Sequence, residues 1–366
     1  MRAWVVRPER EGEPIDALKL EQVAVPEPGP LEVIVRVMAA GVNYDNVWAA
    51  LGEPVSVFGF GDHPQHGHHI GGSDAAGIVE RVGAGVRDWQ PGDEVVIQPN
   101  QGGLIWGYET TWGSFAQYCK VTAEQLLRKP AALSWEEAAS YALTYFTAYR
   151  MLVSRCGLKA GDRVLIWGAG GGLGVFACQL CALAGATTVG VVSSREKGAL
   201  AVKNGASAYI DRTKYQDIRQ DARSFAREVR ELLGGAPDIV FEHVGRATFP
   251  VSVLVAAPFG KIVICGASSG YELDFDVRHL WMRQKEIIGS HMASVEECRR
   301  ANELIEQGRI RPVLWRTFAF EGVAEAHQLM RENKHLGKIA ILVGAGREGE
   351  GKTADGPGAI RAEVAN

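Results

Sequence analysis

The hydrophobic pattern of the first third of the chain is that of short strands. Segments such as LEVIVRVMAAGV, AAGIVERVGAGV and PGDEVVIQP cluster or alternate apolar residues over a few positions, and Gly, Pro and Asp interrupt them. Short apolar runs that turn residues bound are typical of β-strands. This pattern therefore predicts an irregular β domain over residues 1 to about 130.

The pattern then becomes helical and later alternates. In LSWEEAASYALTYFTAYRMLV the apolar spacing is helical, and Ser134 followed by Glu137 forms a capping box at its start. From Arg163 onward the apolar runs RVLIWG, TTVGVVS, SAYI, DIVFEHV, GKIVICGA and EIIGS are mostly separated by helical segments. This alternation predicts an α/β fold with a buried, doubly wound parallel sheet.

The last part of the chain is expected to return to the first domain. After Gly289, SVEECRRANELIEQG predicts a helix and GKIAILV a strand, and we expect both to pack on the β domain. The final stretch is Gly-rich, polar and aperiodic, which predicts a disordered tail. We therefore divide the chain into residues 1–135 with 290–345, residues 136–289, and a tail over 346–366.

The composition limits the classes of partner. The 366 residues, of which 46% are hydrophobic, are enough for about two globular domains. A net charge of −4 gives no field that would attract nucleic acid, and no apolar stretch approaches the ~18 residues of a membrane span. The charged N-terminus, MRAWVVRPEREGEP, does not have the pattern of a signal peptide. We expect a cytoplasmic protein with reduced cysteines, in which Cys178 and Cys181 pack inside a helix and have no redox role.

A glycine-rich turn between a strand and a helix indicates a nucleotide site. In RVLIWGAGGGLGVFACQLCALAG, three residues occupy the positions of G-x-G-x-x-G, with Ala in the first position. Such glycines let the backbone approach a pyrophosphate at the helix N-terminus, although they also serve strand–helix packing. We predict dinucleotide contacts from Ala169, Gly171, Gly172, Leu173 and Gly174.

The end of the next strand favours NADPH over NADH. An NAD site would carry an acidic residue there, about 20 residues after the glycines, to bind the ribose hydroxyls. This chain has Ser193, Ser194, Arg195 and Lys197 instead. Hydroxyls and cations suit a 2′-phosphate, which a carboxylate would repel. The alternative is that these residues form only a solvated helix N-terminus.

The residues of the first domain do not fit a catalytic zinc. Such a site needs about three close protein ligands. AAGVNYDNVW has no thiol, and GGSDAAGIVERVG has Ser73 and Asp74 where a zinc enzyme would carry a His and Glu pair. Histidines gather in the Gly/Pro segment DHPQHGHHIGG, for which we expect a surface loop and not a metal site: His63, His66, His68 and His69.

These segments together identify a family. The chain resembles zinc-independent medium-chain dehydrogenase/reductases and, more narrowly, crotonyl-CoA carboxylase/reductases and related enoyl-CoA reductases. The matching segments include VWAALGEPVSVF, GSDAAGIVERVGAGV, IWGYET, DIVFEHVGRATFPVSV and LWMRQKEIIGSHMAS, and they span residues 1 to about 345. The resemblance implies a GroES-like domain, a Rossmann domain and a homo-oligomer, either a dimer or a tetramer built from dimers.

The resemblance also implies the reaction. The substrate would be a 2-enoyl thioester of coenzyme A, and NADPH would deliver hydride to its β-carbon. Members of the family trap the resulting enolate at the α-carbon with a proton or, in carboxylation to an alkylmalonyl-CoA, with CO2. The thioester carbonyl and hydrogen-bond donors to the enolate oxygen explain how such a site works without zinc.

Four residues can be carried over from the CO2 pocket of the family. Tyr108 and Glu109 in WGYET match an aromatic–Glu pair, and His291 in GSHMA matches the family histidine. We expect Glu109 to hold His291 through a hydrogen bond or a water. The fourth position is Asn in carboxylases, in NYN, whereas this chain has NYD with Asp45.

Asp45 changes the chemistry expected of that pocket. An Asn amide donates an N–H to CO2, whereas an ionised Asp only accepts hydrogen bonds and would repel the new carboxylate. It would instead hold a water or, with a raised pKa, a proton. We therefore predict an enoyl-CoA reductase that traps the enolate mainly with a proton. The alternatives for Asp45 itself are a structural cap and a partner for a nearby cation.

Two further features keep other interpretations open. Arg278 in DVRHLWM matches a family arginine near the CoA phosphates, but a solvated loop arginine fits equally. The insert between QPNQ and IWGYE, which is longer in carboxylases, is only GGL here. The competing functions are a quinone or other activated-alkene reductase and a nucleotide-binding scaffold without turnover. Crotonyl-CoA-dependent or quinone-dependent oxidation of NADPH would distinguish them.

Overall fold

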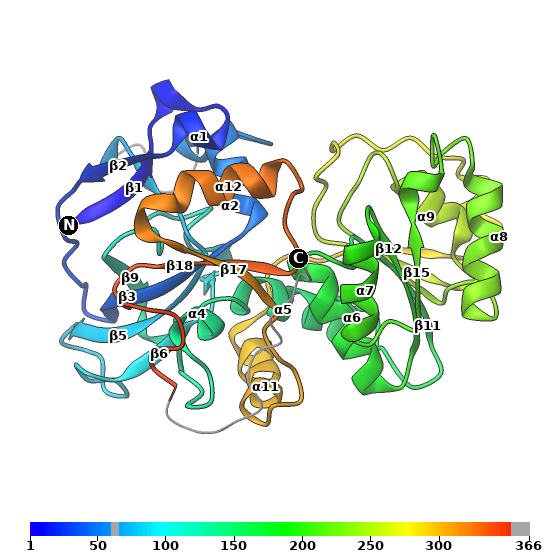
Figure 1. Cartoon of the computed structure of the whole chain (residues 1–366). Coiled ribbons are helices and arrows are strands. Elements are labelled where there is room, and N and C mark those ends of the chain that lie inside the picture. Colours follow the sequence, from blue (N-terminus) through cyan, green and yellow to red (C-terminus); the bar gives the residue numbers. More distant parts are fainter. Residues whose placement is uncertain (60–65, 353–366) are drawn as a thin grey trace. The chain divides into compact units, whose positions relative to one another are not determined.

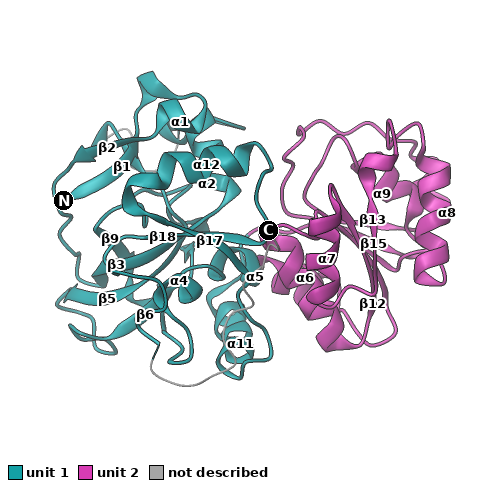
Figure 2. Cartoon of the chain, in the orientation of Figure 1, with its two compact units in different colours: residues 1–146, 292–366 teal, residues 147–291 magenta. Residues whose placement is uncertain are grey.

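The structure is a computed structural model, and it describes residues 1–59 and 66–352. The chain divides into two compact units, which are residues 1–146 with 292–366 (unit 1) and residues 147–291 (unit 2) (Figure 2). The sequence placed the corresponding boundaries at residues 135 and 289. The chain leaves unit 1 after residue 146 and returns to it at residue 292.

Unit 1 is built on an irregular sheet, as the short apolar runs predicted, and its strands are antiparallel except for the parallel pair of β17 and β18 (Figure 1). Among the described residues its order is β10-β6-β5-β3-β18-β17, and β9 also pairs with β3. The late strand GKIAILV is β18, and it pairs antiparallel with β3, which confirms its expected return. The strands are β3 (Glu32–Val42), β5 (Asp74–Val82), β6 (Glu94–Ile97), β9 (Tyr118–Thr122), β10 (Leu126–Arg128), β17 (Leu314–Ala319) and β18 (Lys338–Leu342).

Smaller elements complete unit 1. A three-stranded sheet has the order β2-β1-β4, and β7 and β8 form a two-stranded sheet. These strands are β1 (Arg2–Val6), β2 (Lys19–Gln22), β4 (His69–Ile70), β7 (Asn100–Gln101) and β8 (Leu104–Ile105). The α-helices are α1 (Pro14–Ala17), α2 (Tyr44–Leu51), α4 (Trp135–Ala138), α5 (Ala142–Tyr149), α11 (Val295–Glu306) and α12 (Val323–Arg331). Short 3₁₀ turns are η1 (Pro8–Arg10), η2 (Val57–Gly59), η3 (Ala123–Gln125) and η6 (Phe320–Gly322).

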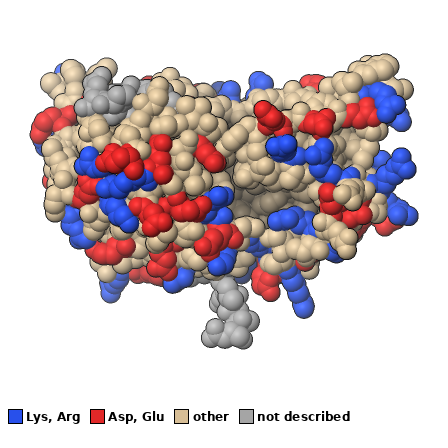
Figure 3. Space-filling view, turned by 90° about the horizontal axis from the view of Figure 1, so that it is seen from above, with Lys and Arg blue, Asp and Glu red and all other residues tan. Residues whose placement is uncertain are grey.

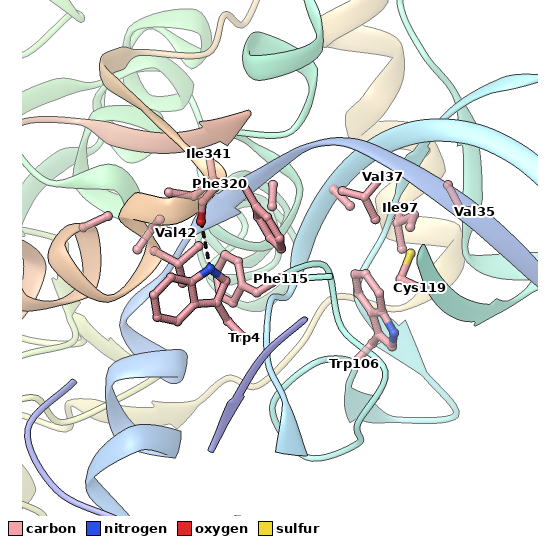
Figure 4. Close-up of a cluster of buried hydrophobic side chains, with 14 of the residues drawn as sticks. Trp4, Val35, Val37, Val42, Ile97, Trp106, Phe115, Cys119, Phe320 and Ile341 are labelled. Carbon is pink, nitrogen blue, oxygen red and sulfur yellow. Dashed lines mark hydrogen bonds between the residues drawn. The ribbon is translucent and has the colours of Figure 1, made fainter. Parts of the chain in front are cut away.

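The core of unit 1 joins segments that are far apart in the sequence. Trp4 and Phe320 meet in a buried cluster, where Trp4 Nε1 donates to the carbonyl of Phe320 at 2.7 Å (Figure 4). Trp106 and Phe115, each 0% exposed, belong to the same cluster. Full burial of side chains of this size stabilises a fold by roughly 1.5–3 kcal/mol each. The N-terminal strand and the last strands are therefore held in one core.

Unit 2 is a doubly wound sheet of parallel strands, which confirms the predicted α/β fold. Its order is β13-β12-β11-β14-β15-β16. The helices α6 and α7 lie on one side of the sheet, and α8 and α9 lie on the other (Figure 1). The strands are β11 (Arg163–Trp167), β12 (Thr187–Val192), β13 (Ala208–Asp211), β14 (Ile239–Glu242), β15 (Lys261–Ile264) and β16 (Glu286–Gly289). The helical segments are η4 (Arg150–Arg155, a π-helical turn), α6 (Gly172–Ala184), α7 (Arg195–Lys203), η5 (Arg212–Lys214), α8 (Ala222–Leu233), α9 (Phe249–Val255) and α10 (Arg278–Trp281).

The helical segment after residue 133 differs from the expectation in one respect. The capping box is present, because Ser134 N donates to Glu137 Oε2 at 2.9 Å and Glu137 N to Ser134 Oγ at 3.4 Å. The expected single helix is instead interrupted after Ala138 and resumes at Ala142.

The segment expected to be a disordered tail begins with ordered contacts. Residues 346–352 pack on unit 1, where Trp135 N donates to the carbonyl of Glu350 at 3.0 Å and Lys129 Nζ to that of Gly351 at 2.6 Å. The rest of the expected tail, 353–366, lies outside the described residues. The expectation of a disordered tail is wrong for residues 346–352, because the backbone N–H of Trp135 and the buried ammonium of Lys129 hold this stretch.

The cysteines, the helix lengths and the surface charges can be examined in the structure. All six cysteines are free, and Cys178 and Cys181 are buried in α6. In the part of the chain that the structure describes, no helix has the length and apolar character that crossing a membrane would require. Acidic and basic side chains are interspersed on the face seen in Figure 3.

Candidate active site

Asp45 lies in the first turn of α2 and is held by donors on all sides. Its Oδ1 accepts from the backbone N–H and the side-chain amide of Asn46, both at 2.7 Å, and its Oδ2 accepts from Ser73 Oγ at 2.7 Å. Burial raises the pKa of Asp45 to about 6, although the hydrogen bonds from Ser73 and Asn46 oppose the shift. The pKa of this carboxyl therefore lies closer to neutral pH than that of an exposed aspartate, and both of its oxygens accept hydrogen bonds within unit 1.

A buried ion pair lies beside Asp45. Lys338 Nζ is 3.0 Å from Asp74 Oδ2, and the two side chains are 1% and 0% exposed. Lys338 also donates to the side chain of Asn43, and Asn43 Nδ2 donates to Asp74 Oδ2 at 3.0 Å. The remaining oxygen of Asp74 accepts from Leu143 N at 2.6 Å. Asp74 thus joins α2, β18 and the start of α5 through hydrogen bonds.

The sequence did not identify Lys338 as part of the site. The only signal was a lysine at the first position of the apolar strand GKIAILV, and such a lysine is ordinarily expected to reach solvent. Its partners lie 264 to 296 positions earlier in the chain. Contacts between residues so far apart in the sequence are formed only by the tertiary structure.

Tyr108 and Glu109 lie in the turn that follows β8. Glu109 Oε2 accepts from Ile105 N at 2.7 Å, which closes the turn. The Tyr108 hydroxyl donates to the carbonyl of Glu53 at 3.3 Å, and its ring lies 6.4 Å from that of Trp48. Tyr108 belongs to a small apolar cluster with residues of α2, the helix that carries Asp45. Tyr108 therefore packs against α2, the helix that carries Asp45.

His291 is the last residue of unit 2 and follows β16. Its side chain is exposed within the chain. Glu109 belongs to unit 1, and so the expected contact between Glu109 and His291 stays a prediction.

The glycine turn of unit 2 has the shape that the motif predicted. Gly168 has a φ of +62°, and a Cβ added at Gly174 would lie 2.3 Å from the Gly168 carbonyl, so α6 packs closely on β11. Ala169 is buried against Gly190 of β12, which explains how Ala replaces the first glycine. The N-cap of α6, Gly171, provides no side-chain acceptor. The N–H groups at the start of α6 are therefore suited to a pyrophosphate.

Cations gather where β12 and β13 end. Ser194 caps α7 by accepting from Lys197 N at 3.3 Å, and Arg195 is exposed in the same turn. Burial and, to a lesser extent, the charge of Arg212 lower the pKa of Lys197 to about 8. Arg212 follows β13, the neighbour of β12 in the sheet, and sequence analysis missed it. A cation directly after a strand was its only signal.

Arg278 is paired within its own loop. Its Nε lies 3.0 Å from both oxygens of Asp276, and its Nη2 lies 2.7 Å from Oδ2. The hydrogen bonds from Arg278 lower the pKa of Asp276 to about 2. Asp276 occupies the edge of the guanidinium formed by Nε and Nη2, so a CoA phosphate would bind Arg278 through the edge formed by Nη1 and Nη2. The expected role in CoA binding stays a prediction.

The histidine-rich segment is only partly a surface loop. His69 lies in β4 and is 0% exposed, so the expectation of a surface loop is wrong for this residue. The rings of His66 and His68 lie 5.1 and 5.9 Å from that of Trp112. His63 lies outside the described residues. Among those described, no group of three or more His, Cys, Asp or Glu side chains is placed to hold a metal ion.

Comparisons with known proteins agree with this geometry. Two family models match, namely "Alcohol dehydrogenase GroES-like domain" over residues 29–131 and "Zinc-binding dehydrogenase" over residues 172–307. The crotonyl-CoA carboxylase/reductase of Cereibacter sphaeroides is 43% identical over 385 residues, which cover 95% of this chain and 89% of that protein. The chain belongs to the crotonyl-CoA carboxylase/reductase family. A crotonyl-CoA reductase of Streptomyces collinus is 42% identical over 93% of this chain and 85% of that protein.

Solved structures of the family confirm the fold. A 2-octenoyl-CoA carboxylase reductase in complex with NADP and 2-octenoyl-CoA has a TM-score of 0.91 at 40% identity, covering 96% of this chain and 89% of that one. A crotonyl-CoA carboxylase/reductase in complex with NADP has a TM-score of 0.88 at 43% identity, covering 95% of each chain. The GroES-like and Rossmann domains predicted from the sequence are thereby confirmed. The name of the second family model refers to zinc, but Ser73 and Asp74 of this chain are engaged in hydrogen bonds within the fold.

Proposed function

We propose that this protein is an NADPH-dependent enoyl-CoA reductase. The observation that carries the proposal is its similarity, at 43% identity over 95% of the chain, to a crotonyl-CoA carboxylase/reductase. When bound, NADPH supplies the hydride that reduces the β-carbon of a 2-enoyl-CoA. The thioester carbonyl of the substrate accepts the resulting charge as an enolate.

Unit 2 holds the cofactor in this proposal. The turn at Gly171, Gly172 and Leu173 offers backbone N–H groups to the pyrophosphate, and relatives of the family have been solved with NADP. Ser193, Arg195 and Lys197 face the 2′-phosphate in this proposal, with Arg212 added. We expect Arg195→Ala to raise the KM for NADPH by about tenfold and to leave that for NADH unchanged. An unchanged preference for NADPH would refute the role of Arg195.

The enolate is trapped mainly by a proton. Both oxygens of Asp45 already accept hydrogen bonds, and the ionised carboxyl has no N–H to offer to CO2. A buried negative charge also disfavours a second carboxylate nearby. Glu109 positions His291 in this proposal, and Tyr108 forms a wall of the pocket. Reductive carboxylation to an alkylmalonyl-CoA is the second candidate, and the names of the relatives favour it.

We infer that the chain assembles into a homo-oligomer in the cytoplasm. β16 is the last strand of its sheet, and large apolar side chains are exposed near it: Phe259, Trp281, Met282 and Ile287. Exposed apolar side chains at a sheet edge are typical of interaction surfaces. The free thiols suit a reducing compartment. Light scattering of wild type and Ile287→Lys tests the assembly, and we expect a smaller species for the variant.

Oxidation of NADPH by the purified protein tests the function. We expect it to require crotonyl-CoA and not to proceed with quinones. Quinone-dependent oxidation would indicate an activated-alkene reductase of the same superfamily. An absence of oxidation with either substrate would indicate a nucleotide-binding scaffold.

A further inference from the structure

The strand order of unit 2 reverses between β11 and β14. β12 and β13 lie on one side of β11, whereas β14, β15 and β16 lie on the other. Ligands of open α/β sheets bind outside the carboxyl ends of the strands at such a reversal. The glycine turn follows β11, and a loop over residues 243–248 follows β14. These two segments flank the crevice of the dinucleotide.

Glu242, the last residue of β14, ties down the loop on its side of the crevice. Its side chain is fully buried. Its Oε2 accepts from the backbone N–H groups of Val244 at 2.7 Å and Gly245 at 3.5 Å. Its Oε1 accepts from the hydroxyl of Thr248 and from Ser252 Oγ at 3.2 Å. The loop from its first residues to the start of α9 is therefore bonded to one carboxylate.

The same network reaches the end of β11. Backbone pairing between β11 and β14 extends to Ile166 of β11. Beyond it, Trp167 Nε1 donates to Ser252 Oγ at 2.8 Å, and His243 Nε2 donates to the Trp167 carbonyl at 2.9 Å. The His243 ring fills the space beside Gly168, since an added Cβ there would lie 2.7 Å from the ring. Side chains thus fix the start of the glycine turn to the loop after β14.

A carboxylate at this position needs an explanation. Burial raises the pKa of Glu242, and the groups that oppose this shift are neutral hydrogen-bond donors and not cations. A buried charge without an opposite charge is costly, so hydrophobic packing alone would favour an apolar residue. A carboxylate accepts from all four donors, whereas an apolar residue would leave two backbone N–H groups unpaired.

We propose that Glu242 is a positioning residue for NADPH. It holds the loop 243–248 and, through Ser252 and Trp167, the glycine turn in the relative geometry that the dinucleotide requires. This inference rests on the proposed NADPH dependence. Glu242 acts through the backbone segments that it fixes, and its effect is therefore expected on cofactor binding more than on turnover.

NADPH binding by Glu242 variants tests the inference. We expect Glu242→Ala to raise the Kd and KM for NADPH at least about tenfold, and to lower kcat at saturating NADPH less than about threefold. Glu242→Gln should stay within about threefold of wild type, because its carbonyl accepts from the two backbone N–H groups while its amide donates to the two hydroxyls. Thr248→Val removes one donor with little change of volume and should weaken NADPH binding about threefold or more.

A matched control lies at the other end of the same strand pair. Asp238 precedes β14 and pairs with Arg163 of β11 at 3.0 Å, away from the crevice. Asp238→Asn should lower the Tm and leave the Kd for NADPH within about twofold of wild type. A purely structural role for Glu242 would instead change the Tm of both variants and the Kd of neither.

The outcomes separate the inference from the proposed function. Wild-type affinity for NADPH in a folded Glu242→Ala variant would overturn the inference. If that variant does not fold, Thr248→Val decides, and wild-type affinity in Thr248→Val would overturn it. A wild-type protein that binds no NADPH would refute the cofactor assignment itself, together with the inference.

Discussion

The two units each bury a carboxylate that joins several elements, but the partners of these carboxylates differ. In unit 1, Asp74 faces the ammonium of Lys338 at 3.0 Å. In unit 2, Glu242 faces hydroxyls and backbone N–H groups. Removal of one member of a charged pair leaves a buried charge without its partner, whereas a network of neutral donors tolerates an isosteric amide. The same kind of residue is therefore expected to respond differently to substitution in each unit.

The largest effect is expected from breaking the ion pair of unit 1. Lys338→Met leaves the Asp74 carboxylate buried without a cation, and we expect the free energy of unfolding to fall by about 3–5 kcal/mol. Urea unfolding measures this change. The exposed pair of Arg300 and Glu296, 2.9 Å apart, provides the control, and Arg300→Met should cost less than about 1 kcal/mol. Equal costs for the two substitutions would contradict the assignment of Asp74 and Lys338 as a buried pair.

A buried histidine of unit 1, His327, extends the comparison to a basic side chain. His327 is 0% exposed and lies edge-on to Phe115, and burial lowers its pKa to about 4. The unfolded chain binds this proton near pH 6.5, so the stability of the fold is lost as the pH falls from about 6.5 toward 4. At pH 4, wild type should have lost up to about 3 kcal/mol of its free energy of unfolding through His327, and His327→Leu should not show this loss.

Urea unfolding of wild type and His327→Leu at several pH values measures the difference. The difference in the free energy of unfolding between the two proteins should be constant near pH 7 and should shift in acid in favour of His327→Leu. Parallel curves would show that the pKa of His327 is the same in the folded protein and in the unfolded chain.

Among the described residues, the donors to Asp45 are neutral, as are those to Glu242, and substitution of Asp45 by its amide is predicted to be favourable. Because its pKa is raised to about 6, the folded state binds the proton more tightly than the unfolded chain, and the protein loses stability as the pH rises from about 4 to 6. We expect Asp45→Asn to increase the free energy of unfolding at pH 7.5 by about 1–2 kcal/mol. The gain should vanish near pH 4, where both side chains are neutral.

Urea unfolding of Asp45→Asn at these two pH values checks the prediction. A variant that is less stable than wild type at pH 7.5 would show that Ser73 and Asn46 require the charge of Asp45. The structural alternative for Asp45 would then account for its presence better than the chemistry of CO2.

The smallest change in stability is expected for Glu242→Gln. Its new amide fits the two hydroxyls of the network, and the free energy of unfolding should change by less than about 1 kcal/mol. Thermal unfolding at pH 7.5 measures it. A cost as large as that of Lys338→Met would break the distinction between the two networks.

Much of the fold follows from local patterns in the sequence. The alternation of short apolar runs and helices after Arg163 predicted the parallel sheet, and the glycine turn predicted its nucleotide edge. The interruption after Ala138 was not predicted, because periodicity does not show where a helix bends on its neighbours. His69 was placed on the surface, because a Gly/Pro-rich context gave no sign of the strand that buries it.

The site was predictable only where a motif carries the chemistry. Asp45, Tyr108 and Glu109 stand out by resemblance, and the glycines by spacing. Lys338 and Glu242 do not, because each reads as an ordinary charged residue next to an apolar run. Their importance comes from partners that the tertiary fold supplies.

Product analysis of the wild-type enzyme tests the central claim most directly. The protein would be incubated with crotonyl-CoA and NADPH under saturating bicarbonate with carbonic anhydrase, and the acyl-CoA products weighed by mass spectrometry. Butyryl-CoA as the main product is the expected result, because Asp45 offers CO2 a buried negative charge and no donor. Ethylmalonyl-CoA as the main product would contradict the account.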